Sequence, residues 1–138
     1  MNFSLKKYLQ IALFWLGYSL ISCLLILFCQ LLLDGESATM LTALCAMVAF
    51  AEFIPGVYNL SNFFDYKKKC EKYTPVEGVI FNWSAGIPRP YGMVIIKEGD
   101  TEYTTGSYIT QSECTEMVGK RVKYAIIEDV LFIYEVLE

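Results

Sequence analysis

The sequence predicts an α+β membrane protein, in which a two-helix transmembrane hairpin is followed by a small five-stranded β-barrel. Three observations support this prediction. The 138-residue chain is 55 % hydrophobic with a mean hydropathy of +0.41, and much of its apolar content lies in the first 64 positions, which is typical of membrane proteins. A basic segment, residues 65–73, then marks a change in composition. From position 74 onward the apolar residues follow the period of two that is typical of strands.

The first expected helix covers residues 8–33, a run of 26 positions without a charged residue. This run exceeds the ~20 residues that a helix needs to cross the hydrocarbon core. A cleavable signal peptide would instead have an apolar region of ~7 to 15 residues and a small-residue cleavage site, and we see neither pattern. A second apolar stretch covers residues 38–60, and the four residues 34–37 between the two stretches suffice only for a tight turn.

The lysines predict the orientation of this hairpin. Lys6 and Lys7 precede the first span and a lysine-rich segment follows the second, whereas the turn between the spans carries only acidic charges. Basic residues near the ends of spans stay cytoplasmic. We therefore expect a two-pass protein of the cell membrane with both termini inside. The expected organisation is a transmembrane hairpin (1–64), a basic juxtamembrane linker (65–73) and a cytoplasmic β-barrel domain (74–138).

The lysines of the linker are candidate contacts for lipid headgroups. Each lysine near an anionic lipid surface can contribute on the order of 1 kcal/mol to binding. The four candidates are Lys67, Lys68, Lys69 and Lys72. Their alternative role is to fix the topology alone, which the positive-inside rule explains without any specific lipid.

One carboxylate, Glu52, interrupts the second span. It belongs to a stripe that follows alternate steps of four and three, and every member of the stripe is small or polar. Small residues allow helix backbones to approach one another in a bilayer. The packing residues of this stripe include Thr42, Cys45, Ala49 and Gly56, and the first span offers a matching stripe that contains Trp15, Ser19 and Ser22.

Antiparallel pairing of the two stripes predicts the partners of Glu52. In this pairing, Ser19 lies opposite Glu52, Ser22 lies opposite Ala49, and Trp15 lies opposite Gly56. We expect Glu52 to point between the helices, with the hydroxyls of Ser19, Ser22 and Tyr18 as hydrogen-bond donors. We also expect it to be largely uncharged, because burial disfavours the ionised form and no basic residue lies at its depth.

Two roles remain open for Glu52. An acid inside a membrane is a candidate for proton or ion handling, which would make the protein a small ion- or proton-handling subunit. The alternative is an interhelical or inter-subunit hydrogen bond. A single acid without a basic partner, in a protein with only two spans, favours the hydrogen bond.

The second half of the chain predicts five strands, which are rich in β-branched and aromatic residues. They cover residues 76–83, 91–97, 101–108, 121–127 and 130–137. Turn residues 98–100 and 128–129 close two hairpins, and residues 109–120 contain one short helical piece that ends at Gly119. In so short a chain, a sheet avoids unpaired edge strands by closing on itself or by wrapping tightly. We expect an OB-like barrel, with an SH3-like barrel as the second choice.

These strands resemble the NfeD-type barrel family. The resemblance lies in a glycine-bearing first strand, a Pro-x-Gly-x-Val hairpin, a Gly-x-x-Val strand and a final apolar strand, in that order. The matching residues are Gly78, Pro90, Gly92, Val94, Gly119 and Val122. The last hairpin departs from the family, with Glu128–Asp129 where a glycine is usual. The resemblance implies a non-catalytic barrel tethered to a bacterial inner membrane, beside a stomatin- or flotillin-type scaffold partner.

The composition argues against several other functions. The chain has no histidine, so it has no ordinary triad or imidazole base, and no glycine-rich loop precedes a helix to hold phosphate. Its cysteines form no Cys-x-x-Cys motif, which disfavours a metal site or a disulfide. We expect neither catalysis nor a cofactor. Ten acids and five bases follow position 73, and this excess of negative charge disfavours nucleic acid.

The favoured function is therefore a membrane-anchored interaction or scaffold subunit whose β-domain binds a protein partner. The candidate contact is the segment 84–92, where Ile87, Arg89 and Tyr91 combine an apolar, a guanidinium and an aromatic side chain, types that are important at interfaces. The alternative is an ordinary proline-stiffened connector. Membrane lipid is a second expected partner, and a second copy of the chain, paired through the small-residue stripe, is a third.

Overall fold

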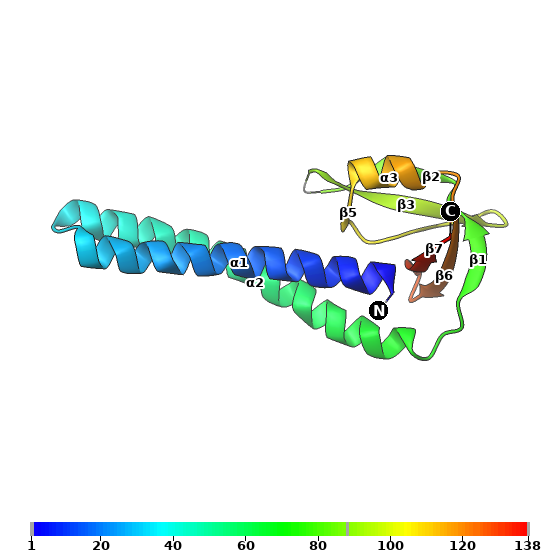
Figure 1. Ribbon diagram of the computed structural model, residues 1–138, viewed down its shortest axis with the longest axis horizontal. Coiled ribbons are helices and arrows are strands. Elements are labelled where there is room, and N and C mark those ends of the chain that lie inside the picture. The colour runs from blue at the N-terminus through cyan, green and yellow to red at the C-terminus, as the bar shows by residue number, and fades with distance from the viewer. Residues whose placement is uncertain (1, 88, 138) are drawn as a thin grey trace. The chain divides into compact units, whose positions relative to one another are not determined.

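The computed structural model describes residues 2–87 and 89–137, and the chain divides into two compact units. Residues 9–62 form the helical unit. Residues 1–8 and 63–138 together form the β unit. The α+β class predicted from the sequence is confirmed, because two long apolar helices are followed by a region of open β-sheets (Figure 1).

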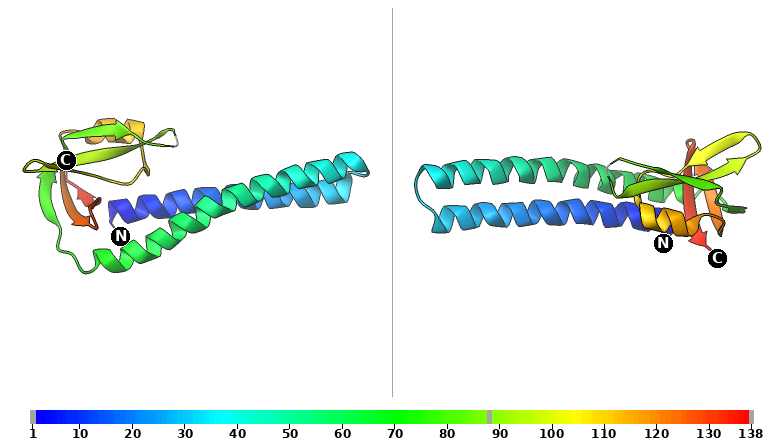
Figure 2. Two further views of the ribbon diagram at one scale, coloured as in Figure 1. Left: turned by 180° about the vertical axis from the view of Figure 1, so that it is seen from behind. Right: turned by 90° about the horizontal axis from the view of Figure 1, so that it is seen from above.

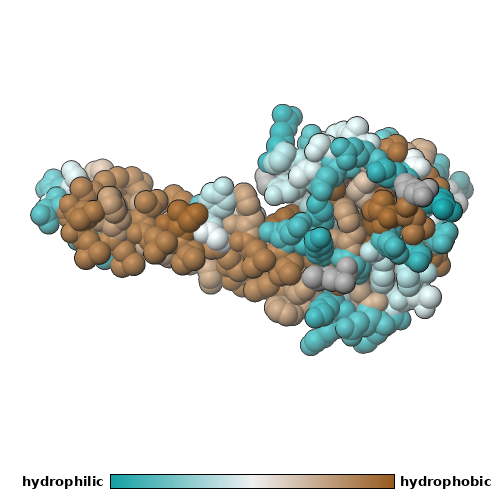
Figure 3. Space-filling view, viewed as in Figure 1, coloured by the Kyte–Doolittle hydropathy of each residue, from teal (hydrophilic) through white to brown (hydrophobic). Residues whose placement is uncertain are grey.

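The helical unit is an antiparallel hairpin of α1 (Phe3–Leu32) and α2 (Glu36–Cys70), which lie side by side in both views of Figure 2. Gly35 adopts a positive φ of 83° in the turn between them, a conformation that glycine takes without steric cost. Both helices are long and apolar enough to cross a membrane. Leucine, methionine and phenylalanine side chains cover the outside of the hairpin, as the brown surface in Figure 3 shows.

Helix α2 continues past the expected second span. It includes residues 61–70, so residues 65–70 of the expected linker are helical. Asp65 and Lys69 form an i,i+4 ion pair of 2.8 Å on this part of the helix, a spacing that brings two side chains together on a helix surface. The boundary between the two units falls inside both helices, since residues 1–8 and 63–70 belong to the β unit.

The β unit contains two antiparallel sheets, where one small, closed or partly open barrel of five strands was expected. The first sheet has the order β1-β6-β7, with β1 (Val76–Val79), β6 (Arg121–Ile127) and β7 (Val130–Val136). In the second, β3 (Tyr91–Glu98) pairs with β2 (Asn82–Ala85), β4 (Thr101–Thr104) and β5 (Ile109–Thr110). Within residues 2–87 and 89–137, no strand pairing joins the two sheets into a closed cylinder.

The expected first strand, 76–83, divides between the two sheets at one peptide. The N–H group of Ile80 donates to the carbonyl of Lys120 at 3.1 Å, on the side of the first sheet. The next N–H group, that of Phe81, donates to the carbonyl of Ile95 in the second sheet at 2.8 Å. Because consecutive residues bond to different sheets, this one segment contributes β1 to the first sheet and β2 to the second.

The expected strand 101–108 also stops early, at Thr104. The cause is a side chain that takes part in the ladder, because Thr105 bonds to Val94 twice. The Thr105 N–H group donates to the Val94 carbonyl, and the Val94 N–H group donates to Thr105 Oγ1, both at 3.1 Å. Thr105 is only 2 % exposed, and these two bonds give its buried N–H group and hydroxyl oxygen each a partner.

Two hairpin turns and one short helix lie between strands of the β unit. Gly99 has a positive φ of 61°, and Glu128 and Asp129 have values of 52° and 62°, which fits the two-residue hairpin loops that need this conformation. Helix α3 (Gln111–Met117) packs on β2 and β3 (Figure 1). It starts with a capping box, in which Thr110 and Glu113 bond to each other's backbone N–H groups.

The core of the β unit includes residues from both long helices. Ser4 Oγ accepts hydrogen bonds from the Tyr108 hydroxyl at 2.9 Å and from the Ile133 N–H group at 2.8 Å. The ring of Tyr8 lies 4.4 Å from that of Tyr108. Tyr66, near the end of α2, packs 4.6 Å from Phe132. The first turns of α1 and the last turns of α2 therefore complete the hydrophobic core of the β-sheets.

Candidate functional site

The carboxylate of Glu52 lies between the two helices of the hairpin, in hydrogen-bond contact with Ser22. Ser22 Oγ donates to Glu52 Oε2 at 3.1 Å, and Ser19 Oγ donates to the carbonyl of Ala49 at 2.9 Å. Both serines are 7 % exposed. The structure thus brings together the three polar residues that the stripes point to, with the partners of the two serines exchanged relative to the expected pairing.

The direction of side chains and carbonyls explains this exchange. A side chain on a helix leans toward the N-terminus of that helix, so the carboxylate of Glu52 reaches back to the level of Ala49, where Ser22 lies. A backbone carbonyl points the opposite way, toward the C-terminus. The Ala49 oxygen is therefore presented at the level of Ser19. Residue spacing alone does not express these two opposite offsets.

The small-residue stripe of α2 lies on the face that contacts α1. Ala49 and Gly56 are buried, and Thr42 and Cys45 are partly buried. A Cβ atom added to Gly56 would lie 2.8 Å from Leu16 Cδ2 and 3.3 Å from the Leu16 backbone nitrogen. Such distances are below ordinary van der Waals contact, so glycine is what allows α1 and α2 to approach this closely.

Two expected members of this contact lie elsewhere. Leu16, and not Trp15, faces Gly56, while the half-buried Trp15 ring packs edge-on against Phe14 at 5.8 Å. Tyr18 is 47 % exposed and its ring lies 4.6 Å from Phe14 on the outer side of α1. Among the described residues, Glu52 receives its hydrogen bond from Ser22 and none from Tyr18.

The four lysines of the basic segment differ in their surroundings. Lys67, Lys68 and Lys72 are exposed. Lys69 Nζ instead bonds to Asp65 Oδ2 and Glu128 Oε1, each at 2.8 Å. Hydrogen bonds to Asp65 and then to Glu128 raise the pKa of Lys69 above its ordinary value. Lys69 therefore links α2 to the β6–β7 turn, and the lysines that remain open to a ligand are the other three.

The expected contact loop is the connection between β2 and β3. The N–H group of Gly86 and the side-chain amide of Gln111 both donate to the Tyr91 carbonyl, at 2.9 and 3.3 Å. Tyr91 is thus fixed and half-buried at the base of the loop. Ile87 is 93 % exposed and Arg89 is exposed. Pro88, which lies between them, is outside the described residues.

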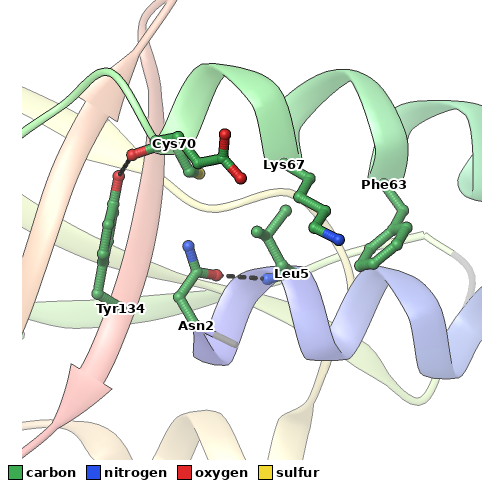
Figure 4. Close-up of a pocket in the computed structure, with 7 residues that line it drawn as sticks. Asn2, Leu5, Phe63, Lys67, Cys70 and Tyr134 are labelled. Atoms are coloured by element: carbon green, nitrogen blue, oxygen red, sulfur yellow. Dashed lines mark hydrogen bonds between the residues drawn. The ribbon is translucent and has the colours of Figure 1, made fainter.

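The structure also contains a pocket that the sequence did not predict. Its volume is about 540 Å³, and it lies in the β unit between the first turn of α1, the last turns of α2 and strand β7 (Figure 4). The lining residues are Asn2, Leu5, Phe63, Lys67, Cys70, Glu71 and Tyr134. A sequence signal existed, because Phe63 and Lys67 are four residues apart on one face of α2, and Glu71 follows four residues later, directly after the helix ends.

Two hydrogen bonds shape the ends of this pocket. Asn2 Oδ1 accepts from the Leu5 N–H group at 2.8 Å, which caps the start of α1. The Tyr134 hydroxyl donates to the Cys70 carbonyl at 2.8 Å, which satisfies a carbonyl at the end of α2. Both bonds are visible as dashed lines in Figure 4. Hydrogen-bonded helix ends therefore form part of the pocket wall.

A partly buried ion pair joins α1 to α3. Lys7 Nζ bonds to Glu113 Oε1 at 2.5 Å, and Thr110 Oγ1 donates to Glu113 Oε2 at 3.0 Å. Partial burial raises the pKa of Glu113, but the hydrogen bonds from Lys7 and Thr110 together outweigh it, so the pKa lies below its ordinary value. Burial raises the pKa of the neighbouring Cys114 thiol to about 11, which makes it a poor nucleophile near neutral pH.

Within the described parts of the chain, no group of three or more His, Cys, Asp or Glu side chains is arranged to hold a metal ion. Comparisons with family models, with curated proteins and with solved structures give no match to this chain. The resemblance to NfeD-type barrels stays a prediction from the residues of the β-strands.

Proposed function

We propose that this protein is a non-catalytic, membrane-anchored interaction subunit, in which the hairpin crosses the bilayer twice and the β unit binds a protein partner on the cytoplasmic side. The observation that carries the proposal is the exposed loop between β2 and β3, whose apolar tip residue Ile87 is 93 % exposed. An exposed large apolar side chain beside an arginine is a typical composition for an interface anchor.

The surface of the hairpin supports the membrane part of the proposal. Leu31 is 81 % exposed and Met47 70 % exposed, and apolar residues of this size surround both helices. Monomeric soluble proteins rarely expose continuous apolar surfaces of this extent. Two apolar helices satisfy their own backbone hydrogen bonds, which a bilayer requires. Lysines at residues 6–7 and 67–72 favour the cytoplasmic side for both ends of the hairpin.

The construction of the loop supports the protein-binding part. Its base is fixed by the two hydrogen bonds to the Tyr91 carbonyl, so less conformational entropy is lost when a partner binds than for a free segment. The likeness to NfeD-type barrels favours an OB-like arrangement of the two sheets and a stomatin- or flotillin-type scaffold protein as the partner. Both belong to the proposal.

A photo-crosslinking amino acid at position 87 tests the proposed contact. We expect it to form an adduct with a protein in living cells, and the substitution Arg89→Glu to weaken that adduct. The matched control is the same crosslinker at Val118, which is also an exposed apolar residue of the β unit (39 % exposed) and lies outside the loop. Adducts with lipid or solvent alone at position 87, or equal protein adducts at both positions, would contradict the proposal.

Glu52 has a structural role in this proposal, supported by its 3.1 Å hydrogen bond from Ser22. Glutamine keeps a hydrogen-bond acceptor at this place but does not release a proton. The substitution Glu52→Gln is therefore expected to leave the crosslinked adduct at position 87 unchanged. Loss of the cellular phenotype in Glu52→Gln, with the adduct intact, would instead favour the proton-handling alternative.

A further inference from the structure

The pocket at the helix ends combines an apolar wall with two opposite charges. Leu5 and Phe63 supply the apolar wall, and both are buried: Leu5 is 4 % exposed and Phe63 is 6 % exposed. Lys67 and Glu71 line the same pocket and are exposed. The ion pairs of the described residues do not include one between Lys67 and Glu71. Both charges are therefore available to a ligand that carries a negative and a positive group.

Lys67 lies close enough to the end of the apolar span along α2 to reach the lipid headgroups, if the span crosses a bilayer. Lys67 lies seven residues after Leu60 on the uninterrupted helix α2, and seven residues of helix measure ~10 Å. The headgroup layer on each side of the hydrocarbon core is about 5–8 Å thick. The Lys67 side chain leans back toward the N-terminus of α2, and Figure 4 shows it extending toward Phe63 and Leu5.

We propose that this pocket binds the headgroup of an aminophospholipid of the phosphatidylethanolamine class, an inference that rests on the membrane anchoring proposed above. Lys67 binds the phosphate, and the Glu71 carboxylate accepts hydrogen bonds from the primary ammonium group. The apolar wall of Leu5 and Phe63 receives the start of an acyl chain. The order of the groups matches, because phosphate precedes ammonium going outward from the bilayer, as Lys67 precedes Glu71 along α2.

The position of Glu71 explains the expected preference for an amine. Glu71 follows directly on the C-terminus of α2, at Cys70, and the partial negative charge of a helix C-terminus also attracts cations. A choline headgroup carries the same charge but has no N–H group to donate. A glycerol headgroup has no positive charge, so its lipid would gain only the contact with Lys67. The pocket is thus expected to rank ethanolamine above both.

Native mass spectrometry of the full chain in detergent tests this ranking. The probes are dioleoyl phosphatidylethanolamine, phosphatidylcholine and phosphatidylglycerol, titrated separately. We expect the wild type to retain ethanolamine lipid about tenfold better than choline lipid, the size expected for hydrogen bonds to a charged group. Glu71→Gln should bring this ratio close to one, and Lys67→Gln should weaken binding of all three lipids.

Lys68→Gln is the matched control, because Lys68 is the exposed neighbour of Lys67 and does not line the pocket. It should leave all three affinities unchanged. Equal retention of the ethanolamine and choline lipids by the wild type, stronger retention of the glycerol lipid, or an unchanged ratio in Glu71→Gln would each overturn the inference. Thermal unfolding of every variant verifies that Lys67→Gln and Glu71→Gln fold like the wild type.

Membrane anchoring itself is measured separately, by testing whether the chain stays in cell membranes that are extracted at alkaline pH. A chain that is released from the membranes overturns the anchoring and this inference together. A chain that stays in the membranes but shows no preference for the ethanolamine lipid overturns this inference alone.

Discussion

Ser4 accepts a hydrogen bond of 2.9 Å from the hydroxyl of Tyr108, a residue 104 positions further along the chain. Ser4 is fully buried, and it also accepts the N–H group of Ile133. One hydroxyl in the first turn of α1 therefore satisfies polar groups from a loop and from strand β7. Burial raises the pKa of Tyr108 above its ordinary value, so this hydroxyl stays protonated and remains a donor.

The substitution Ser4→Ala should destabilise the β unit by about 1–3 kcal/mol, because it leaves the Ile133 N–H group buried without its acceptor and the Tyr108 hydroxyl with only the Leu131 carbonyl at 3.5 Å. Thermal unfolding in detergent, followed by near-UV circular dichroism, measures this change. Thr74→Ala is the control, since Thr74 is exposed, and it should unfold like the wild type. An unfolding midpoint of Ser4→Ala equal to that of the control would show that the hydrogen bonds contribute nothing.

The close approach of α1 and α2 at Gly56 gives a second prediction. Gly56→Ala should separate the helices and destabilise the hairpin by about 1–3 kcal/mol, the usual cost of overpacking. The control is Gly17→Ala, because a Cβ atom at Gly17 meets no heavy atom within 4 Å, and alanine there should stabilise the helix by about 0.5–1 kcal/mol. Distances between spin labels on the two helices measure the separation. Equal effects of the two substitutions would contradict the observed contact.

The ion pair of Lys7 and Glu113 predicts a dependence of stability on pH. The folded-state pKa of Glu113 is below its ordinary value of 4.5, so its contribution is present above about pH 4.5 and is lost as the pH falls through the folded value. Glu113→Gln removes this contribution at every pH. Unfolding midpoints of the wild type and of Glu113→Gln should therefore differ at pH 7 and converge toward pH 3. A difference that stays constant across this range would argue against the pair.

The proposed orientation predicts which residues react from outside the cell. A membrane-impermeant maleimide should label Ser37→Cys, in the turn region between the helices, in intact cells. It should label Thr74→Cys, which follows α2, only after the cells are permeabilised. The five natural cysteines are replaced by alanine or serine in both variants. Labelling of Thr74→Cys in intact cells would place the β unit outside and contradict the orientation.

Some parts of the fold were predictable because they depend on local sequence patterns. The charge-free run 8–33 identified α1 as a long apolar helix, and the spacing of small residues identified the face of α2 that contacts α1. The exchange of partners at Glu52 depends on how side chains and carbonyls lean along a helix axis, which residue spacing alone does not express.

Other parts depend on contacts between distant residues, which leave no periodic signal. In the sequence, Ser4 is an ordinary polar residue near the start of an apolar span. Its hydrogen-bond partners, Tyr108 and Ile133, lie 104 and 129 positions away. The division of the first strand occurs at Ile80–Phe81, without a glycine or proline to mark it. The change of sheet is visible only in the hydrogen bonds: the Ile80 N–H group bonds to the Lys120 carbonyl, and the Phe81 N–H group bonds to the Ile95 carbonyl.

The participation of residues 3–8 in the core of the β unit has a consequence for biosynthesis. These residues are synthesised well before Phe132 and Ile133, and their binding site is complete only when those two residues have been made. During that interval β7, whose Phe132 ring lies 6.2 Å from the Tyr8 ring in the folded protein, has not yet been made. A chain whose translation is arrested before β7 would display this unfilled core, which is a recognisable mark for chaperones and for proteases that degrade unfinished polypeptides.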